Sequence, residues 1–383
     1  MTYTGAMLDI ALDSVRLLPR RRFMQLLTAA AALGAMPFRS QGAEVPWLTE
    51  VGPGSTTPIP PDRPLEPLLI ADDGTRIDSV QSWELRREAL RRAWLDFLGP
   101  MPDKRPDVAL EILSEERLDG VLRQRVRFAA EEGVPGEGYL LRPLDADASR
   151  KRAGVVALHS TTDDNIAEIA GVTGRPSRHF GLQLVRRGFV VFCPRNFLWQ
   201  EAADYRQAVQ KLRERHPRTL GMHKMLWDAM RGVDVLESLV DFVDSRRIGA
   251  MGHSLGAKQV LYLAAFDRRV RASVASEGGV GFRFTNWDAP WYLGEAIHAA
   301  DFVLNHHQLL ALAAPRPFLI LAGEQGPGAA DGQRTWPYVA AAAEVYRLYG
   351  EPVRLAMYNH RQGHDVPPLA QKRLVQWLEC YLG

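Results

Sequence analysis

The hydrophobic pattern of the chain changes character near residue 154. Before it, residues 122–128 alternate, with apolar or amide side chains at even positions and arginines at 123, 125 and 127. An alternation of period two is typical of an antiparallel strand with one buried face, and residues 138–141 continue as a second strand. Beyond residue 154, short unbroken apolar runs alternate with helical segments. That pattern predicts parallel strands buried on both faces.

We expect an α/β fold built on a doubly wound, mostly parallel sheet with antiparallel N-terminal strands. A helix ends at Gly99-Pro100, and another carries an apolar face from Met222 to Val240. A C-terminal helix is expected over 369–382. The expected parallel strands cover residues 154–158, 188–193, 248–251, 270–275, 318–322 and 353–358.

The N-terminus carries an export signal. Three arginines at 20–22 and Phe23 precede a short apolar stretch from Leu26 to Met36, which is too short to span a membrane. The pattern resembles a twin-arginine signal, which exports folded proteins. It predicts a signal peptide over 1–43, an N-terminal arm and helix over 44–105, and a catalytic domain over 106–383 with an insertion at about 278–310. We therefore expect a periplasmic or extracellular protein without a stable membrane span once the signal is removed.

Composition narrows the class of partner. The 383 residues carry a formal net charge of +2, which provides no strong field for nucleic acid or an anionic membrane surface. Cys193 lies in an apolar run and is expected to be a buried thiol, and with Cys380 it forms no metal-binding spacing. His306-His307 is a weak zinc candidate, because no further ligand has suitable spacing. We expect no cofactor and no metal.

The segment Gly252-His253-Ser254-Leu255-Gly256 follows an apolar strand and precedes a small-residue helix. That order is required for a nucleophile elbow, in which the serine sits on a strained strand-to-helix turn between two glycines. The N–H of Leu255 would then face a developing oxyanion. The second donor is expected from the loop after the first parallel strand, at Ser160 or Thr161, with His159 bracing that loop.

A serine nucleophile needs a base and an acid that orients the base, and in this kind of fold both follow the serine. His364, in a loop before the last helix, is the expected base, and His360 competes with it. Asp331 is the expected acid. Glu277, at the end of the strand after the elbow helix, and Glu324 remain open as alternatives.

These motifs make the chain resemble the α/β-hydrolase superfamily, and within it exported dienelactone-hydrolase-like and acetyl-xylan-esterase-like proteins. The resemblance implies a triad of Ser254, Asp331 and His364, whereas dienelactone hydrolases proper use cysteine as nucleophile. The segments that carry it are Ala157–Thr162, Gly252–Gly256, Ala314–Phe318, Ala330–Gly332 and Gly363-His364.

A partial likeness to glucuronoyl esterases rests on two positions. Lys258 falls where those enzymes have a sugar-contacting lysine, and Glu277 falls near their alternative acid. Their arginine directly after the nucleophile is replaced here by Leu255.

The sequence thus predicts a serine carboxylic-ester hydrolase for a small acyl or carbohydrate-linked ester such as acetyl-xylan, with Trp287 and Trp291 as candidates for stacking on sugar rings. The alternatives are a glucuronoyl esterase, a peptidase of the prolyl-oligopeptidase type, and a non-catalytic exported binding protein on the same fold. No room precedes the catalytic domain for the propeller of such a peptidase. A Rossmann dehydrogenase is excluded because no glycine-rich turn follows the first parallel strand.

Overall fold

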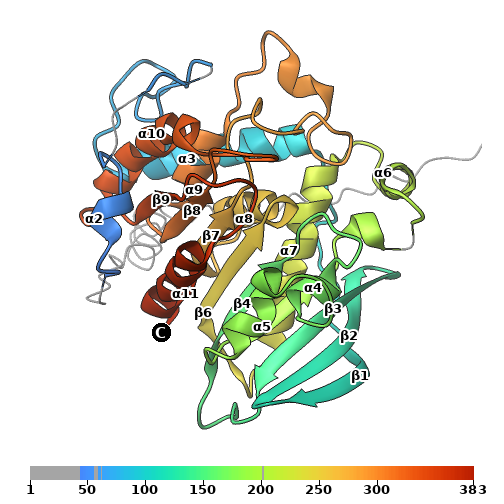
Figure 1. The fold of residues 1–383 in the computed structure, drawn as a ribbon. Coiled ribbons are helices and arrows are strands. Elements are labelled where there is room, and N and C mark those ends of the chain that lie inside the picture. Colours follow the sequence, from blue (N-terminus) through green and yellow to red (C-terminus); the bar gives the residue numbers. More distant parts are fainter. Residues whose placement is uncertain (1–43, 56–58, 62, 201) are drawn as a thin grey trace, which may run out of the picture. The chain divides into compact units, whose positions relative to one another are not determined.

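A nine-stranded sheet runs through the part of the chain that the computed structural model describes, which is residues 44–383 without 56–58, 62 and 201 (Figure 1). The predicted signal peptide lies outside the described residues. The strand order is β1-β2-β3-β5-β4-β6-β7-β8-β9. From β1 to β5 in this order, each strand pairs antiparallel with its neighbour. From β5 to β9, each strand pairs in parallel with its neighbour. The predicted fold class is confirmed.

Strand β1 was not predicted, the other strands overlap the runs that predict them, and β8 has the expected bounds. The largest difference is at β6, which starts five residues before the expected Ile248. Residues 244–247 are polar or charged and are exposed or only partly buried, so they left no apolar run in the sequence. The strands are β1 (Glu111–Leu118), β2 (Val121–Glu131), β3 (Val134–Pro143), β4 (Arg152–Leu158), β5 (Val190–Pro194), β6 (Val243–His253), β7 (Val270–Ser276), β8 (Phe318–Ala322) and β9 (Leu355–Asn359).

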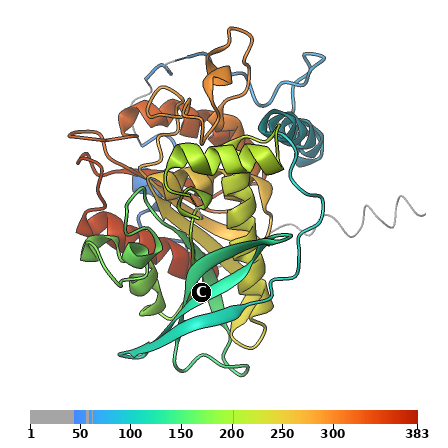
Figure 2. The ribbon, with the colours of Figure 1, turned by 90° about the vertical axis from the view of Figure 1, so that its right-hand side faces the viewer.

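Helices cover both faces of the sheet (Figures 1 and 2). Because side chains alternate along a strand, Val156 and Leu158 of β4 pack into one apolar core with α3, α7, α8, α9 and α10, while Val155 and Ala157 pack into a second core with α2, α4, α5 and α11. The helices are α2 (Leu48–Val51), α3 (Val80–Leu98), α4 (Ile166–Ile169), α5 (Phe180–Val185), α6 (Tyr205–Arg215), α7 (Gly221–Ser238), α8 (Leu255–Phe266), α9 (His306–Ala313), α10 (Trp336–Leu348) and α11 (Pro368–Leu382).

The N-terminal arm packs onto the C-terminal helix. The ring of Trp47 stacks on that of Trp377 with centroids 5.9 Å apart, and its Nε1–H donates to Gln376 Oε1 at 2.8 Å. The described residues belong to one compact unit, so the arm expected at 44–105 is part of the same body as the sheet.

The arginine face of β2 is less exposed than alternation predicts. Arg123 is only 6% exposed, and its guanidinium donates to the carbonyls of Ala170 and Gly171 just after α4. The α4 segment therefore covers this part of the face. Cys193 is fully buried as predicted, and burial raises the pKa of its thiol. No disulfide joins it to Cys380.

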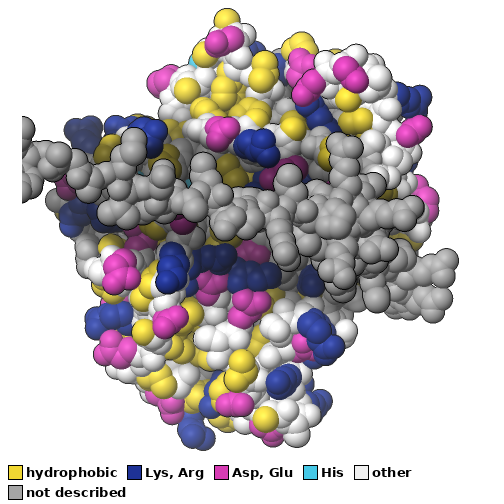
Figure 3. Space-filling model, turned by 180° about the vertical axis from the view of Figure 1, so that it is seen from behind, with side chains coloured by type: hydrophobic (Ala, Val, Ile, Leu, Met, Phe, Trp, Pro, Cys, Tyr) yellow, Lys and Arg dark blue, Asp and Glu magenta, His cyan; other side chains and the backbone are white. Residues whose placement is uncertain are grey.

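On the part of the face in Figure 3 that the grey atoms leave visible, cationic and anionic side chains of the described residues are mixed. Within those residues, none of the helices combines the length and the apolarity that crossing a bilayer demands.

Candidate active site

Ser254 stands at a strained turn between β6 and α8, as the elbow motif predicts. Its φ is +58°, a left-handed conformation that costs a residue with a side chain of order 1–3 kcal/mol. The flanking glycines allow the tight crossing, since a Cβ on Gly252 would lie 2.3 Å from Gly256 O and a Cβ on Gly256 would lie 2.0 Å from Leu158 O. Helix α8 starts at Leu255, whose N–H has no protein acceptor among the described residues.

The elbow lies at the point where the strand order of the sheet reverses, because β4 is flanked by β5 on one side and β6 on the other. Ligand sites in open α/β sheets form at such points. His159, after β4, uses Nδ1–H to donate to Ser160 O at 2.7 Å, and its Nε2 accepts from Asn196 N–H at 3.1 Å. Burial lowers the pKa of His159 to about 4, so the ring is neutral. It braces the loop of Ser160 and Thr161 as expected.

His364 lies beside the elbow. Its ring centroid is 4.8 Å from that of His253, the residue before Ser254, and its carbonyl accepts from Arg178 Nη2 at 3.0 Å. The side chain of His364 is 25% exposed, so substrate can reach it. Within the described chain no side-chain hydrogen bond joins His364 to Ser254. Hydrogen bonds between catalytic groups often shorten only in the substrate complex.

The carboxylate that faces His364 belongs to Glu277. Its Oε2 lies 3.6 Å from His364 Nδ1 and accepts the N–H of Ala330 at 2.9 Å, while Oε1 accepts the N–H of Gly323. Glu277 follows β7 directly, has a left-handed φ of +57° and is 1% exposed. Two strained residues with side chains, Ser254 and Glu277, thus end neighbouring parallel strands at the same edge.

Asp331, the expected acid, is held elsewhere. Its carboxylate accepts the N–H groups of Gly279 and Val280, both at 2.9 Å, and the hydroxyl of Thr335 at 2.8 Å. Burial, followed by the negative charge of Glu277, raises the pKa of Asp331. Within the described residues no hydrogen bond or ion pair joins Asp331 to His364.

Glu324 binds neighbouring loop segments. Its carboxylate accepts from Asn359 Nδ2 at 2.9 Å and from Gln333 N–H at 3.4 Å, so it ties the loop after β8 to the end of β9. The structure therefore brings Ser254, His364 and Glu277 to one place. It does not bring Asp331 or Glu324 to His364.

Two buried histidines next to this site have other environments. The His360 side chain is 1% exposed and lies on the far side of Glu277, with Nε2 3.5 Å from Oε1. His253 Nδ1 lies 3.1 Å from Ser276 Oγ, and burial, then the charge of His364, lowers its pKa well below 6.5. Sequence reasoning assigned His253 no role, because a variable position inside the elbow motif carries no signal of its own.

Of the three residues expected to bind sugar, two are buried and one is half-buried. Trp287 is fully buried and donates to Gly279 O at 2.6 Å, so it is a core aromatic and not a stacking surface. Lys258 is 4% exposed, with Nζ 3.8 Å from the Trp287 ring centroid and bound to Thr285 Oγ1. Burial lowers its pKa well below 10.5, against the raising effect of the nearby Asp331 charge. Trp291 is half-buried and is available at the surface.

The histidine pair at the start of α9 is structural. His306 Nδ1 lies 2.7 Å from Val280 O and Nε2 lies 2.9 Å from Tyr262 OH, so both ring nitrogens are occupied in the core. His307 Nε2 donates to Glu66 O at 2.9 Å. The weak zinc candidate therefore has no free pair of ring nitrogens.

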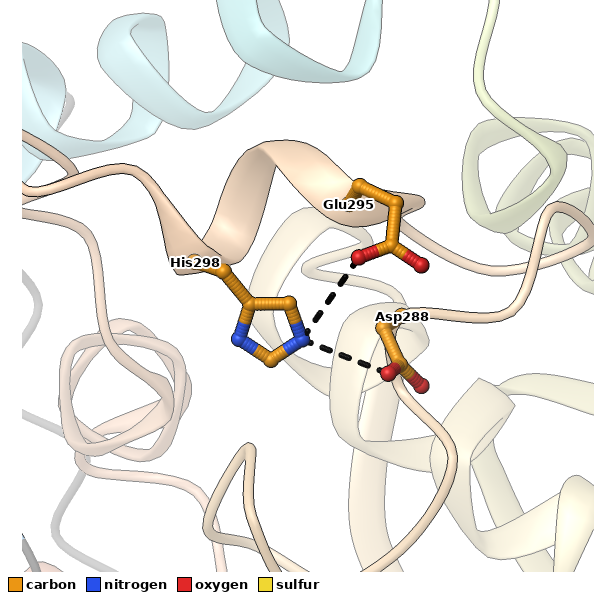
Figure 4. A group of neighbouring side chains, drawn as sticks. All are labelled: Asp288, Glu295 and His298. Atoms are coloured by element: carbon orange, nitrogen blue, oxygen red, sulfur yellow. Dashed lines mark hydrogen bonds and ion pairs between the residues drawn. The ribbon is translucent and has the colours of Figure 1, made fainter.

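A group of metal-binding residue types lies instead on the insertion. His298 Nε2 is 3.3 Å from Asp288 Oδ2 and 4.0 Å from Glu295 Oε2 (Figure 4). The three side chains are 42–85% exposed and face each other, as surface ion pairs commonly do. We assign no metal to them.

Known proteins share this architecture. A carbohydrate esterase, MZ0003, from an unknown prokaryotic organism is 22% identical over 381 residues, which cover 78% of this chain and 85% of that protein. The structure of a glucuronoyl esterase from Solibacter usitatus matches with a TM-score of 0.69 at 19% identity, over 84% of this chain and 99% of that one. A Bacteroides fragilis protein assigned as an acetyl xylan esterase matches with a TM-score of 0.58 at 16% identity, over 77% and 79% of the two chains.

The family comparison agrees with the resemblance that the motifs suggest. Residues 148–326, which include β4 to β8 and the elbow, match the model of the Dienelactone hydrolase family. Residues 148–326 therefore carry a dienelactone hydrolase family domain, and the chain has an α/β-hydrolase-like fold.

Proposed function

We propose that the chain is a serine carboxylic-ester hydrolase that acts on carbohydrate esters. The observation that carries the proposal is the Ser254 elbow beside His364, whose Nδ1 lies 3.6 Å from Glu277 Oε2. In space, a nucleophile lies beside a base and the base lies beside an orienting acid, which is the arrangement that acyl transfer needs. We assign the acid to Glu277 and give Asp331 a structural role.

The proposed reaction follows from these positions. His364 takes the proton of Ser254 Oγ as the hydroxyl attacks the ester carbonyl, and Glu277 stabilises the imidazolium that forms. The N–H of Leu255 and one from Ser160 or Thr161 bind the oxyanion. The alcohol leaves with the proton from His364, and water then cleaves the acyl-enzyme with His364 again as base.

Two ester classes are candidates. An ester of a glucuronic acid is supported by the match that spans 99% of a glucuronoyl esterase and by Glu277 as acid. An acetyl ester on xylan is favoured by Leu255, since the arginine that follows the nucleophile in glucuronoyl esterases is absent here. In both candidate substrates the ester is attached to a carbohydrate.

A row of half-buried aromatic rings supports a sugar substrate. Trp291 packs on Tyr205 with centroids 5.4 Å apart, and Tyr205 packs on Trp199 at 5.2 Å. Trp199 in turn lies 5.1 Å from the ring of His159, below the proposed oxyanion loop. Aromatic side chains with an exposed part suit the apolar faces of sugar rings, so Trp291→Ala should raise KM more than it lowers kcat.

The test is a labelling and substrate experiment on wild type and Ser254→Ala. A fluorophosphonate probe should label the wild type once, at Ser254, and leave the variant unlabelled. Wild type should hydrolyse p-nitrophenyl acetate and either methyl glucuronate or acetylated xylan, and the variant should lose these activities. Absence of labelling in a folded wild type would favour the non-catalytic binding protein, and hydrolysis of a proline peptide instead of both esters would favour the peptidase.

We also propose export of the folded protein, from the arginines at 20–22 and the apolar run after Phe23. Replacing the three arginines by lysine should leave the precursor in the cytoplasm. Unchanged export would point to another route.

A further inference from the structure

Glu277 has a second imidazole behind it. His360, directly after β9, lies with Nε2 3.5 Å from Glu277 Oε1, and its side chain is 1% exposed. The other ring nitrogen, Nδ1, accepts the N–H of Gln362 at 3.2 Å. Because Nδ1 is an acceptor, it leaves Nε2 as the nitrogen that can donate, and Nε2 is the ring nitrogen 3.5 Å from the carboxylate.

The surroundings of the two carboxylate oxygens match. Each oxygen has one backbone N–H, from Gly323 or Ala330, and one imidazole nitrogen at 3.5 or 3.6 Å. The two rings differ in access, since His364 is 25% exposed and His360 is 1% exposed. His360 therefore cannot meet an ester, although its spacing in the sequence made it a competitor for the role of base.

We propose that His360 is a positioning residue of the esterase site. Its Nε2, 3.5 Å from Oε1 and without a hydrogen-bond partner among the described residues, closes to a hydrogen bond during the reaction and keeps the carboxylate in the rotamer that aims Oε2 at His364. A carboxylate held on one side by a fixed donor loses less freedom when the imidazolium forms on the other side, and so supports it better in the transition state. The inference rests on the proposed function, with Ser254 as nucleophile and Glu277 as orienting acid.

The charged and titratable groups around this carboxylate come from several elements. His360 and His364 follow β9, His253 precedes the elbow, Asp331 lies in the loop after β8, and Arg178 contacts the carbonyl of His364. Among them, His360 lies on the Oε1 side with Nε2 at 3.5 Å, and His364 lies on the Oε2 side with Nδ1 at 3.6 Å.

Two polar replacements of His360 separate positioning from packing. In His360→Asn, Oδ1 can take the place of Nδ1 and still accept the N–H of Gln362, but no donor reaches Glu277. In His360→Gln, the amide nitrogen can take the place of Nε2 and donate to Oε1. We expect His360→Asn to lower kcat about 10- to 100-fold with little change in KM, as for the loss of a hydrogen bond to a charged group, and His360→Gln to recover most of it.

The pH profile provides a readout that packing alone would not move. The acid limb of kcat/KM reports protonation of the base in the free enzyme. With Glu277 poorly placed, the limb should move to lower pH in His360→Asn and stay in place in His360→Gln. His307, also buried and with its Nε2 bound to Glu66 O, provides the control pair His307→Asn and His307→Gln, whose limb should not move.

Ser254→Ala and Glu277→Gln are measured beside these variants. If both are inactive while His360→Asn has wild-type kcat and an unmoved limb, the positioning role is wrong and the esterase proposal stands. Equal losses in His360→Asn and His360→Gln with an unmoved limb also overturn it. Full activity in Ser254→Ala overturns the proposed function itself.

Discussion

Glu277 and Asp331 end up in neighbouring regions with opposite kinds of environment. Both are buried carboxylates at the carboxyl edge of the sheet, 1% and 2% exposed. Asp331 accepts three hydrogen bonds, all at 2.9 Å or less, from Gly279, Val280 and Thr335. Glu277 accepts two backbone N–H groups and faces two imidazoles at 3.5 and 3.6 Å that donate no hydrogen bond to it.

The difference indicates different tasks. All the hydrogen bonds that Asp331 accepts come from groups fixed by the fold. We therefore infer that Asp331 stabilises the turn after Glu277 and the start of the segment before α10. Glu277, by contrast, can still accept a hydrogen bond from the partly exposed His364. Its negative charge can therefore stabilise the imidazolium that forms when His364 gains a proton. We therefore expect changes at Glu277 to affect catalysis and changes around Asp331 to affect stability.

The largest effect is expected for Glu277→Gln. Loss of the charge beside His364 should lower kcat on the order of 10⁴-fold with the fold retained, because the imidazolium is no longer stabilised or held in the right tautomer. The measurement is kcat on p-nitrophenyl acetate, with circular dichroism to verify folding. Asp331→Asn is the matched control and should keep kcat within about tenfold. The reverse ranking would return the role of acid to Asp331, and a comparable loss in both would mean that two acids serve one histidine.

Trp287→Ala tests whether the turn that binds Asp331 contributes to stability and not to catalysis. The indole is fully buried and its N–H donates to the carbonyl of Gly279, in the same turn whose N–H groups bind Asp331. Emptying this site should lower the free energy of unfolding by about 3–5 kcal/mol. Urea unfolding measures the loss. Below the unfolding transition kcat should fall far less than in Glu277→Gln, and a loss of kcat without a loss of stability would contradict the division.

The smallest effect is expected for the stability of Asp331→Asn and its pH dependence. In Asp331→Asn, the amide nitrogen faces a backbone N–H that the carboxylate oxygen accepted, so one hydrogen bond is lost. This should lower the free energy of unfolding by about 1–3 kcal/mol. The folded-state pKa of Asp331 lies above its ordinary value of 3.8, so its contribution to stability is present below that pH and is lost as pH rises through the folded-state pKa. Asparagine has no such dependence. The difference between wild type and variant, from urea unfolding at several pH values, should therefore be largest at the lowest pH, and a difference that grows with pH would contradict this.

Much of the site could be predicted from the sequence, because its signals are local. The elbow needs only a strand, two glycines around Ser254 and a following helix, and each leaves a pattern within about 20 residues. His364 was predicted as the base from its place between the last strand and the last helix, and the structure places it beside the elbow. Strand Phe318–Ala322 has the bounds that its apolar run predicts. The export signal is local too, and it stays a prediction.

The choice of acid, by contrast, was made by tertiary structure. Glu277 and Asp331 follow neighbouring parallel strands, so both lie near His364 by topology, and no local pattern says which carboxylate turns toward it. The decision depends on the left-handed turn at Glu277, on the N–H groups of Gly323 and Ala330 from a distant loop, and on the turn at 279–280 that binds Asp331. The burial of Trp287, which belongs to the insertion, and of Lys258, which packs against its ring, is likewise a matter of packing. The sequence by itself determined which chemical groups are present and on which strand ends they stand, since that follows from local periodicity. Only the folded chain decided which of them face one another, because that depends on contacts between segments far apart in the sequence.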